Sequence, residues 1–473
     1  MDDRTEKDSG PSPILRTITG FVTFSLDDFN PMTESGGDGF YEKLGKVSEH
    51  LDALKKNFTD ESYTVQTLRI ATNPWPEWLT VTSNVTNYEA LRHMHRLDKD
   101  PPYKKIIQER LELLDEVLTE YGIFACALGP GDSKIPCHAD ICELIVKTSS
   151  KLSCSLAVDS TNHIAALKAA DTIYNLSKIG EDQLGLSNFQ FCVSSKTCLP
   201  CIPFFPVAYN YCLFDSDPVR CTLPPETPKD ETYKYKFAIG LENGHFVQQA
   251  LKECKTISRI DKYFRKKMTD AILPIQEIAN KYVSDEKYDK VEFIGVDTSL
   301  NPGLDPEGSI ATAIEQLEEV STFGKPGTVA AAAQLTTTIQ SLEGIKRSGY
   351  CGLMLPVCED QRLADLSKLH RHGDDDNGIN SGGGGTPKLS IQHLLNVSSV
   401  CGVGIDTVPI SGIASPENKQ RLASLILDVV GLAERWKKPL TCRVFPVPNR
   451  DVGQSTNFKD FPHMVDAEVF DIC

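Results

Sequence analysis

The chain has 473 residues, of which 40% are hydrophobic and 24% are charged, and its formal net charge is −16. This composition is typical of a globular protein and excludes a disordered, collagen-like or membrane-spanning chain. Proteins that bind nucleic acids or anionic membranes use a basic surface, so we expect neither partner here. A small anionic ligand is compatible with the charge, because a local site can be positive on a negative protein.

The fifteen cysteines are scattered along the chain and are odd in number, unlike the disulfide framework of a small secreted domain. The first ten residues are polar and acidic, which differs from a secretory signal or an arginine-rich transit peptide. No apolar run reaches the roughly 18 residues of a membrane helix. We therefore expect a cytoplasmic protein without a membrane span, and a homo-oligomer is compatible with the sequence.

Two segments are predicted to lie outside the folded core. Residues 1–13 are predicted to be a disordered lead. Residues 371–387, RHGDDDNGINSGGGGTP, combine an acidic run with four successive glycines and can bury little apolar surface, so they are predicted to form a surface insertion. Residues 14–470 are then expected to form one large domain.

Within this domain, short apolar segments alternate with longer amphipathic ones, which is typical of mostly parallel strands covered by helices. The predicted strands are 16–26, 63–71, 122–128, 153–159, 188–193, 234–241, 291–297, 352–357, 400–407 and 442–447. The predicted helices include 41–58, 106–121, 161–179, 264–282, 307–320, 328–342 and 418–436. Ten strands exceed the eight of the common α/β barrel, so they indicate a larger barrel or a long open sheet.

Polar or turn-rich clusters follow several of the predicted strands. They are residues 69–74 (RIATNP), 296–303 (VDTSLNPG), 356–360 (PVCED) and 404–409 (GIDTVP). In parallel α/β structures, ligands bind outside the carboxyl ends of the strands. Polar side chains at these positions are therefore the first candidates for chemistry.

Six sequence blocks carry a family resemblance. They are YTVQTLRIATNPWPE (63–77), FIGVDTSLNPG (293–303), FGKPGTVAAAAQLTTTIQSL (323–342), RSGYCGLMLPVCED (347–360), SSVCGVGIDTVPI (398–410) and CRVFPVP (442–448). With them the chain resembles the domain of unknown function 711 family, also called the UPF 0210 family. The resemblance is tight over 291–448 and looser over 16–241, and the segment 371–387 is an insertion relative to the family.

The resemblance implies the fold of pyruvate formate-lyase, a ten-stranded α/β barrel built from two five-stranded halves. It implies no particular reaction, since a fold does not determine a function. Glycyl-radical chemistry needs a glycine loop near the C-terminus. Residues 347–350, Arg-Ser-Gly-Tyr, lack the spacing of that motif and lie far from the end, so we expect an ordinary turn there and no glycyl radical.

Four residues are candidates for catalysis: the carboxylates of Asp297, Glu359 and Asp406, and the thiol of Cys401. Asp297, followed by Ser299, could bind a cation or orient a substrate, or it could cap the next loop. Glu359 could transfer protons beside Asp360, although adjacent carboxylates commonly mark a helix N-terminus. Asp406 matches a family position and could do the same chemistry.

Two cysteines also match family positions. Cys401 could be a nucleophile if a nearby base or cation favours its thiolate. A single cysteine beside glycines is more often a small packed apolar residue. Cys154 has the same two interpretations, and the sequence does not decide between a reactive and a packed thiol for either residue.

Arginines and a glycine-rich turn are the candidates for ligand binding. Arg69 and Arg443 lie in predicted strands, where a buried guanidinium needs a partner such as a substrate carboxylate or a structural Asp. Asn73 could contact a ligand or cap a turn. Gly327 and Thr328 begin a predicted helix whose N-terminal N–H groups could hold an anion, with Thr328 as a plausible N-cap.

These residues predict an enzyme that acts on a small carboxylate-bearing or acyl metabolite by acid/base or nucleophilic chemistry, with a role in specialised metabolism left open. A divalent cation at the carboxylates is compatible with the pattern, but no cofactor is specified. The alternative is a non-catalytic protein that binds or senses a small ligand on an enzyme-derived fold. The substrate, the reaction and the oligomeric state are not encoded in any motif of the chain.

Overall fold

Nine strands in the described part of the chain form a single sheet. In the computed structural model, residues 12–25, 28, 38–80, 97–180, 184–195, 202–204, 208, 235–288, 290–368, 388–458 and 460–472 are described. Within them the strands are β1 (Ile14–Val22), β2 (Val65–Thr72), β3 (Ala125–Asp132), β4 (Leu152–Val158), β5 (Phe191–Ser195), β6 (Tyr235–Glu242), β7 (Val291–Asp297), β8 (Gly404–Ser411) and β9 (Thr441–Val447).

The strand order across the sheet is β7-β6-β1-β2-β3-β4-β5-β9-β8. Strands β1 to β5 run parallel to one another, and so do the pairs β6–β7 and β8–β9. The junctions β1–β6 and β5–β9 are antiparallel. The predicted α/β class with mostly parallel strands is therefore confirmed. Strands β6 to β9 run antiparallel to strands β1 to β5.

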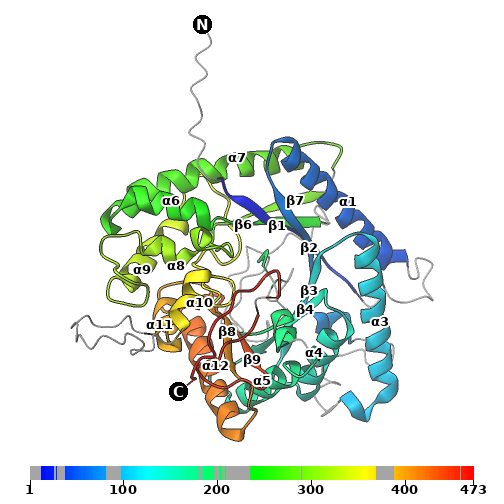
Figure 1. Cartoon of the computed structure of the whole chain (residues 1–473). Helices are drawn as coiled ribbons and strands as arrows, with labels where there is room; N and C mark the ends of the chain where they lie inside the picture. Colours follow the sequence, from blue (N-terminus) through cyan, green and yellow to red (C-terminus); the bar gives the residue numbers. More distant parts are fainter. Residues whose placement is uncertain are drawn as a thin grey trace.

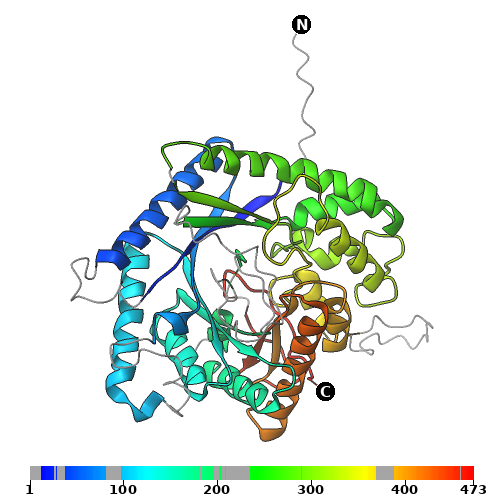
Figure 2. The same cartoon turned by 180° about the vertical axis from the view of Figure 1, so that it is seen from behind.

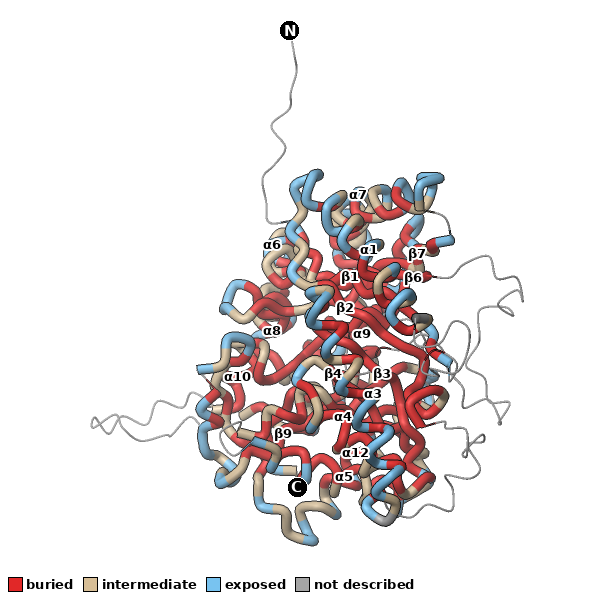
Figure 3. Tube along the Cα trace, turned by 90° about the vertical axis from the view of Figure 1, so that its right-hand side faces the viewer, coloured by how far each residue is buried: buried red, intermediate tan, exposed pale blue. Residues whose placement is uncertain are grey.

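Helices lie on the outside of the curved sheet (Figure 1), and the view from behind shows the same arrangement (Figure 2). They are α1 (Asp38–Asp60), α3 (Pro101–Glu120), α4 (Pro136–Thr148), α5 (His163–Leu176), α6 (Gly244–Cys254), α7 (Arg265–Val283), α8 (Ile310–Ile314), α9 (Thr328–Ile339), α10 (Gln361–Ser367), α11 (Ile391–Ser398) and α12 (Pro416–Trp436). Burial follows this layering, with buried strands inside and exposed helix faces outside (Figure 3).

The two faces of the sheet differ in the size of their side chains. On β4, Leu152, Cys154 and Leu156 belong to the large core that packs under the helices. The alternate residues of the same strand, Ser153 and Ser155, are small, polar and fully buried. Because side chains alternate between faces along a strand, these small residues line the inner face. The inner face therefore has room for loops and for a pocket.

The segment 347–356 links the two edge strands through isolated bridges. Leu353 pairs with Leu300, just beyond β7, and Pro356 pairs with Asp406 in β8. Backbone hydrogen bonds accompany these bridges, from Met354 to Leu300 at 2.9 Å and from Val357 to Asp406 at 3.2 Å. The predicted strand 352–357 is thus wrong as a regular strand, because Pro356 has no N–H to donate and the segment changes partner midway.

Two other predicted elements differ from the structure. The strand predicted at 400–407 begins at Gly404, so Cys401 lies in the turn that precedes β8. The helix predicted at 307–320 shrinks to the five residues of α8, because the chain turns again after Ile314. The predicted disordered lead up to residue 11 and the predicted insertion 371–387 lie outside the described residues.

The helices of the described part of the chain are shorter or more polar than a bilayer crossing requires, and none of them could span a membrane.

Candidate functional site

A pocket lies on the inner face of the sheet. It has a cavity volume of about 80 Å³, and since one water needs roughly 10–15 Å³, this is space for roughly six waters or a ligand of comparable size. The lining residues are Arg16, Arg69, Phe189, Cys192, Phe204, Glu242, Asn301, Pro302, Leu304, Tyr350, Met354, Pro356, Glu359, Val403, Asp406, Thr441 and Arg443.

The pocket collects residues from strands that are distant in the sheet order. Arg69 lies on β2, and Asp406 lies on β8, five strands further along. In a flat sheet, with about 4.8 Å between neighbours, these strands would be about 24 Å apart. The sheet therefore curves strongly, so that the inner faces of β1, β2, β8 and β9 approach one another. The sequence predicts ligand contacts at the carboxyl ends of the strands, but this pocket lies on the inner, concave face of the curved sheet.

Arg443 is the centre of the pocket's charge cluster. Its Nε donates to Asp406 Oδ1 at 2.6 Å, its Nη2 donates to Glu359 Oε1 at 3.3 Å, and its Nη1 donates to the carbonyl of Phe189 at 3.3 Å. The guanidinium also lies 4.8 Å from the centroid of the Phe189 ring. The side chains of Arg443, Glu359 and Asp406 are only 9%, 15% and 15% exposed, so these charges interact with little screening by water.

The cluster changes the protonation of its members. Burial would lower the pKa of Arg443, but the charges of Asp406 and Glu359 raise it above its ordinary value, so the residue stays cationic. Burial, helped by the repulsion from Asp406, raises the pKa of Glu359 although Arg443 opposes this. One cation serves two carboxylates, and Asp406 holds the shorter hydrogen bond. The net effect on Glu359 favours its protonated form.

Two further arginines line the same pocket. Arg69 is 7% exposed, donates from Nε to Thr67 Oγ1 at 3.1 Å and lies 5.7 Å from the Phe124 ring. Burial lowers its pKa to about 9, and the charge of Arg16 contributes, so it remains protonated at neutral pH. Arg16 forms an ion pair with Glu242 at 2.9 Å. The pocket therefore contains three guanidinium groups.

The formal charges of the pocket balance when every group is ionised. Three arginines (Arg16, Arg69, Arg443) face three carboxylates (Glu242, Glu359, Asp406). Once Glu359 takes up a proton, the described lining has one excess positive charge. In that state the local charge of the pocket is opposite in sign to the net charge of the chain, −16.

Asp297 and Ser299 lie outside the lining of this pocket. Asp297 is fully buried and accepts hydrogen bonds from the amides of Ser299, Tyr350 and Cys351 and from the Ser299 hydroxyl, at 2.6–3.0 Å. Burial raises its pKa although these bonds oppose the shift. Gly349 packs so closely on Asp297 that a Cβ there would meet its Oδ2. The geometry favours a structural role for Asp297 in joining two turns, one of which presents Tyr350 to the pocket.

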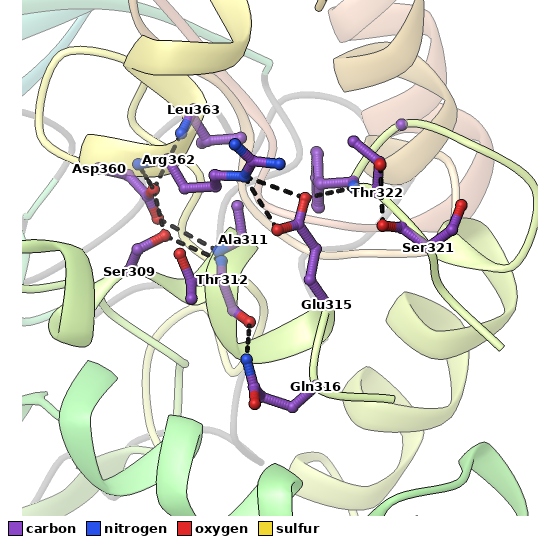
Figure 4. Close-up of polar contacts among 12 residues, drawn as sticks. Ser309, Ala311, Thr312, Glu315, Gln316, Ser321, Thr322, Asp360, Arg362 and Leu363 are labelled. Atoms are coloured by element: carbon purple, nitrogen blue, oxygen red, sulfur yellow. Dashed lines mark hydrogen bonds and ion pairs between the residues drawn. The ribbon is translucent and has the colours of Figure 1, made fainter. Parts of the chain in front are cut away.

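Asp360, the neighbour of Glu359, is a helix cap (Figure 4). Its Oδ1 accepts from the Ser309 hydroxyl at 2.6 Å and from the amides of Arg362 and Leu363 at 3.1 Å, and its Oδ2 accepts from the amide of Ile310 at 2.9 Å. One carboxylate thereby caps both α8 and α10. Of the two adjacent carboxylates, Asp360 therefore caps helices, as the structural interpretation predicts, and Glu359 lines the pocket.

The two cysteines that match the family are packed away from the pocket lining. Cys401 Sγ accepts from the amide of Leu353 at 2.8 Å, and burial raises the pKa of its thiol. Cys154 lies on the outer face of β4 near Cys142, and burial likewise raises the pKa of its thiol. Both sulfurs are therefore held as neutral thiols, which favours packing over nucleophilic chemistry.

The remaining ligand-binding candidates also have structural partners. Asn73 exchanges hydrogen bonds with the backbone of Phe24, at 2.8 and 3.1 Å, and donates to Glu77 at 2.6 Å. Gly327, with φ +101°, is the N-cap residue of α9, and Thr328 is the first residue of that helix. The Thr328 hydroxyl accepts from the amide of Gly324 at 3.0 Å. None of these three residues belongs to the described lining of the pocket.

Sequence reasoning missed Arg16, Glu242 and Cys192 as pocket residues. Arg16 lies near the start of β1, whereas the polar clusters in the sequence that predict a site follow the ends of strands. Glu242 ends β6, which is antiparallel to β1, and this pairing is what brings the two charges together. Alternation offers a signal for Cys192, since the strand Phe191–Ser195 places it on the face opposite the apolar Phe191 and Val193. Strand direction, however, could not be read from the pattern.

The carboxylates proposed as cation ligands do not form a metal cluster. Glu359 and Asp406 share Arg443, while Asp297 binds backbone amides. Within the described residues, no three His, Cys, Asp or Glu side chains converge in a way that could hold a metal ion.

The curved, mostly parallel sheet and its charged inner pocket define an α/β protein. The family model described as "Uncharacterised ACR (DUF711)" matches residues 12–459. The chain belongs to this family, which confirms the resemblance in the sequence.

Several bacterial relatives carry the name UPF0210 protein. The chain is 26% identical to the one from Halothermothrix orenii over 228 residues, which is 46% of this chain and 44% of the relative. It is 29% identical to the one from Syntrophobacter fumaroxidans over 171 residues (36% and 33%) and 31% identical to the one from Ligilactobacillus salivarius over 174 residues (36% and 34%). The chain thus spans less than half the length of these relatives.

Proposed function

We propose that the chain is an enzyme that acts on a small carboxylate-bearing or acyl metabolite in the inner pocket. The observation that carries the proposal is the convergence of Arg16, Arg69 and Arg443 with a buried carboxylic acid, Glu359, in one small cavity. Guanidinium groups recognise carboxylates through paired hydrogen bonds. A buried acid whose pKa is raised keeps its proton to higher pH than an exposed glutamic acid, which suits it to proton transfer.

In this scheme Arg69 holds the ligand's carboxylate or acyl oxygen, and Glu359 exchanges a proton with the reacting centre. Asp406 keeps Arg443 in place through the 2.6 Å hydrogen bond, so that Arg443 can stabilise negative charge that develops in the transition state. The cavity volume restricts the part of the ligand that is enclosed to roughly six non-hydrogen atoms. The cytoplasmic location and the compatibility with a homo-oligomer are predictions from the sequence.

We also infer that the sheet closes into a ten-stranded barrel of the pyruvate formate-lyase kind, with the segment 347–356 in the place of the tenth strand. The bridges from Leu353 to Leu300 and from Pro356 to Asp406 support this inference, since they join both edges of the sheet. The antiparallel junctions on either side of β1–β5 also suit a barrel of two halves.

A binding experiment tests the proposed function. Acetate, propionate, pyruvate and malonate are titrated into the whole chain by calorimetry, with acetamide as the neutral control, and melting temperatures are recorded in parallel. We expect one or more acids to bind and to raise the melting temperature, because a ligand that binds only the folded state stabilises it. Arg69→Met should weaken binding at least tenfold, whereas Arg259→Met, at an exposed position, should not. Failure of every acid to bind would refute the proposal.

The pH dependence separates the role of Glu359 from simple charge attraction. A bound anion stabilises the protonated acid, so binding takes up a proton and should tighten as the pH falls through the raised pKa of Glu359. Glu359→Gln should remove this dependence, and Glu318→Gln, on an exposed helix-following turn, should keep it. Binding without turnover of any acid or acyl ester would favour the alternative, a ligand-binding or regulatory protein.

A further inference from the structure

A row of four polar side chains crosses four neighbouring strands on the inner face. The β4–β5 register pairs Ser155 with Cys192, and continuing the β5–β9 register, which pairs Val193 with Cys442, places Cys192 opposite Arg443. Arg443 then bonds Asp406 on β8. Paired residues of neighbouring strands lie on the same face of the sheet. The order of the row is therefore hydroxyl, thiol, guanidinium and carboxylate.

Within the described residues, Cys192 is the one cysteine that lines the pocket. Cys192 alternates with Phe191 and Val193 along β5 and pairs with Ser155, so its side chain points inward, although it also packs against the hydrophobic core. Charge on its sulfur would interact favourably with Arg443. A cation beside a thiol stabilises the thiolate, which is the reactive form. Cys192 and Cys401 are equally buried, at 1% and 2% exposed, but of the two Cys192 alone lines the pocket, with Arg443 on the same face.

Two buried hydroxyls flank this thiol. Ser155 lies opposite Cys192 on β4, and Ser194 follows it by two residues on the same face; they are 0% and 1% exposed. Neither hydroxyl oxygen has a hydrogen-bond partner among the residues that the structure describes. Neither serine belongs to the described lining of the pocket, but buried polar groups usually have partners, so two such donors beside one lining thiol indicate that an oxygen of a ligand bound at Cys192 completes them.

We propose that Cys192 is the nucleophile of this pocket and that it accepts an acyl group from a small acyl thioester. The proposal rests on the proposed function, because it uses the same cavity. The Cys192 sulfur forms a bond to the acyl carbon, and its proton passes to the carboxylate pair Glu359 and Asp406. The bond from the acyl carbon to the donor's sulfur breaks, and the departing thiolate takes that proton. Ser155 and Ser194 donate hydrogen bonds to the acyl oxygen, where negative charge develops.

Mass spectrometry of the whole chain tests this step with S-acetyl-N-acetylcysteamine as the acyl donor. We expect one acetyl group per chain, removable by hydroxylamine and located on Cys192 by peptide mapping. It should appear at least tenfold faster than on Cys401 or Cys442, which are buried like Cys192 but lie outside the pocket lining; burial raises the pKa of Cys442 to about 12. Cys192→Ser should abolish the modification, and Cys401→Ser should leave it unchanged.

Ser155→Ala supplies a second variant that is expected to fold, since it removes one hydroxyl without a partner among the described residues. It should slow acetylation several-fold. The absence of acetyl on Cys192, or faster acetylation at another cysteine, would overturn the proposal. Carboxylate binding by Cys192→Ser is measured in parallel. If acids still bind while Cys192 is not acylated, the nucleophile is wrong and the proposed function stands; if no acid binds, the proposed function itself fails.

Discussion

The neighbours of Glu359 have opposing effects on the pKa of its carboxyl group. Burial and Asp406 favour the protonated acid, while Arg443 favours the carboxylate, and the net result is a raised pKa. A buried ion pair stabilises a fold less than its contacts suggest, because removing both charges from water offsets much of the attraction. Here one cation is shared by two carboxylates, so some of the desolvation of Glu359 is left uncompensated. This is a cost to stability that a functional site can retain.

Glu359→Gln should therefore change the pH dependence of stability. Between the ordinary glutamate pKa of 4.5 and the raised folded value, the folded chain binds more protons than the unfolded chain, so its free energy of unfolding falls as the pH rises. The variant does not titrate at this position. Its free energy of unfolding relative to the parent should accordingly increase with pH across this window, as measured by urea unfolding. A flat difference, like that expected for the exposed Glu318→Gln, would contradict the raised pKa.

Asp297→Asn tests the structural role of the other predicted catalytic carboxylate. The side-chain amide of the variant keeps one oxygen that can accept hydrogen bonds. Its NH2 group replaces the second carboxylate oxygen and faces the N–H or O–H groups that donate to that oxygen in the parent chain. Leaving one or two buried donors without an acceptor should lower the free energy of unfolding by about 2–4 kcal/mol. Acid binding per folded molecule should change less than twofold. Normal stability with lost binding would instead support the catalytic interpretation. The exposed Asp270→Asn is the matched control.

The residues of the site were only partly predictable. Arg69, Glu359, Asp406 and Arg443 were named from their positions in or after strands, and the structure places all four around one pocket. Asp297 has the same sequence setting as Asp406, a carboxylate after apolar residues, but it meets backbone amides instead of a guanidinium. The difference arises from the fold of the turn at residues 349–351, which no local pattern specifies.

At the level of elements, Asp360 connects two short helices that would not persist alone. Helices α8 and α10 have five and seven residues, below the length at which isolated helices are stable. Their N-termini share one carboxylate, and Arg362 reinforces the junction by bonding both oxygens of Glu315, at 2.9 and 3.1 Å. This junction directly follows Glu359, so it fixes the backbone from which the pocket acid projects.

Asp360→Ala should be more destabilising than the loss of an ordinary cap. Removing a single capping side chain costs about 1 kcal/mol, and here two helix starts and the Ser309 hydroxyl lose their acceptor, so we expect about 3 kcal/mol. Ser415→Ala, which removes the cap of α12 alone, is the comparison and should cost about 1 kcal/mol. Hydrogen exchange should accelerate in α8 and α10 together. Acceleration in only one of them would contradict the shared cap.

Long elements were easier to predict than short ones for a physical reason. The 21 residues of α12 repeat an apolar face many times and start at Ser415-Pro416, a cap followed by proline, so the predicted helix was off by two residues. The segment 352–357 is apolar and buried like a strand, yet its backbone bonds go to two different partners. The apolar composition of a segment predicts that it is buried. Whether it forms a regular strand depends on hydrogen-bond partners that are distant in sequence.

At the scale of the whole molecule, curvature of the sheet makes the site. The inner face of the central strands carries small residues, such as Thr19, Ala71 and Ala127, and Arg69 projects from among them. The register pairs Thr19 with Arg69, so they share this face. Larger side chains here would fill the space enclosed by the curved sheet. The long-range pairing of β1 with β6 and β5 with β9 sets the curvature, and neither pairing is visible in the hydrophobic pattern.

The inferred closure by residues 347–356 has a measurable consequence. The amides of Leu300, Met354 and Val357 donate to Gly352, Leu300 and Asp406. If these bonds close the ring, the three amides should exchange with deuterium as slowly as amides in β1 and β2, because their opening requires the edges β7 and β8 to separate. Asp451 and Val452 are exposed residues whose amides donate to the side chains of Gln454 and Asp451, outside the sheet, so these amides should exchange fast and serve as the reference. Fast exchange at residues 300, 354 and 357, with β1 and β2 protected, would mean an open sheet and would remove the wall that carries Glu359.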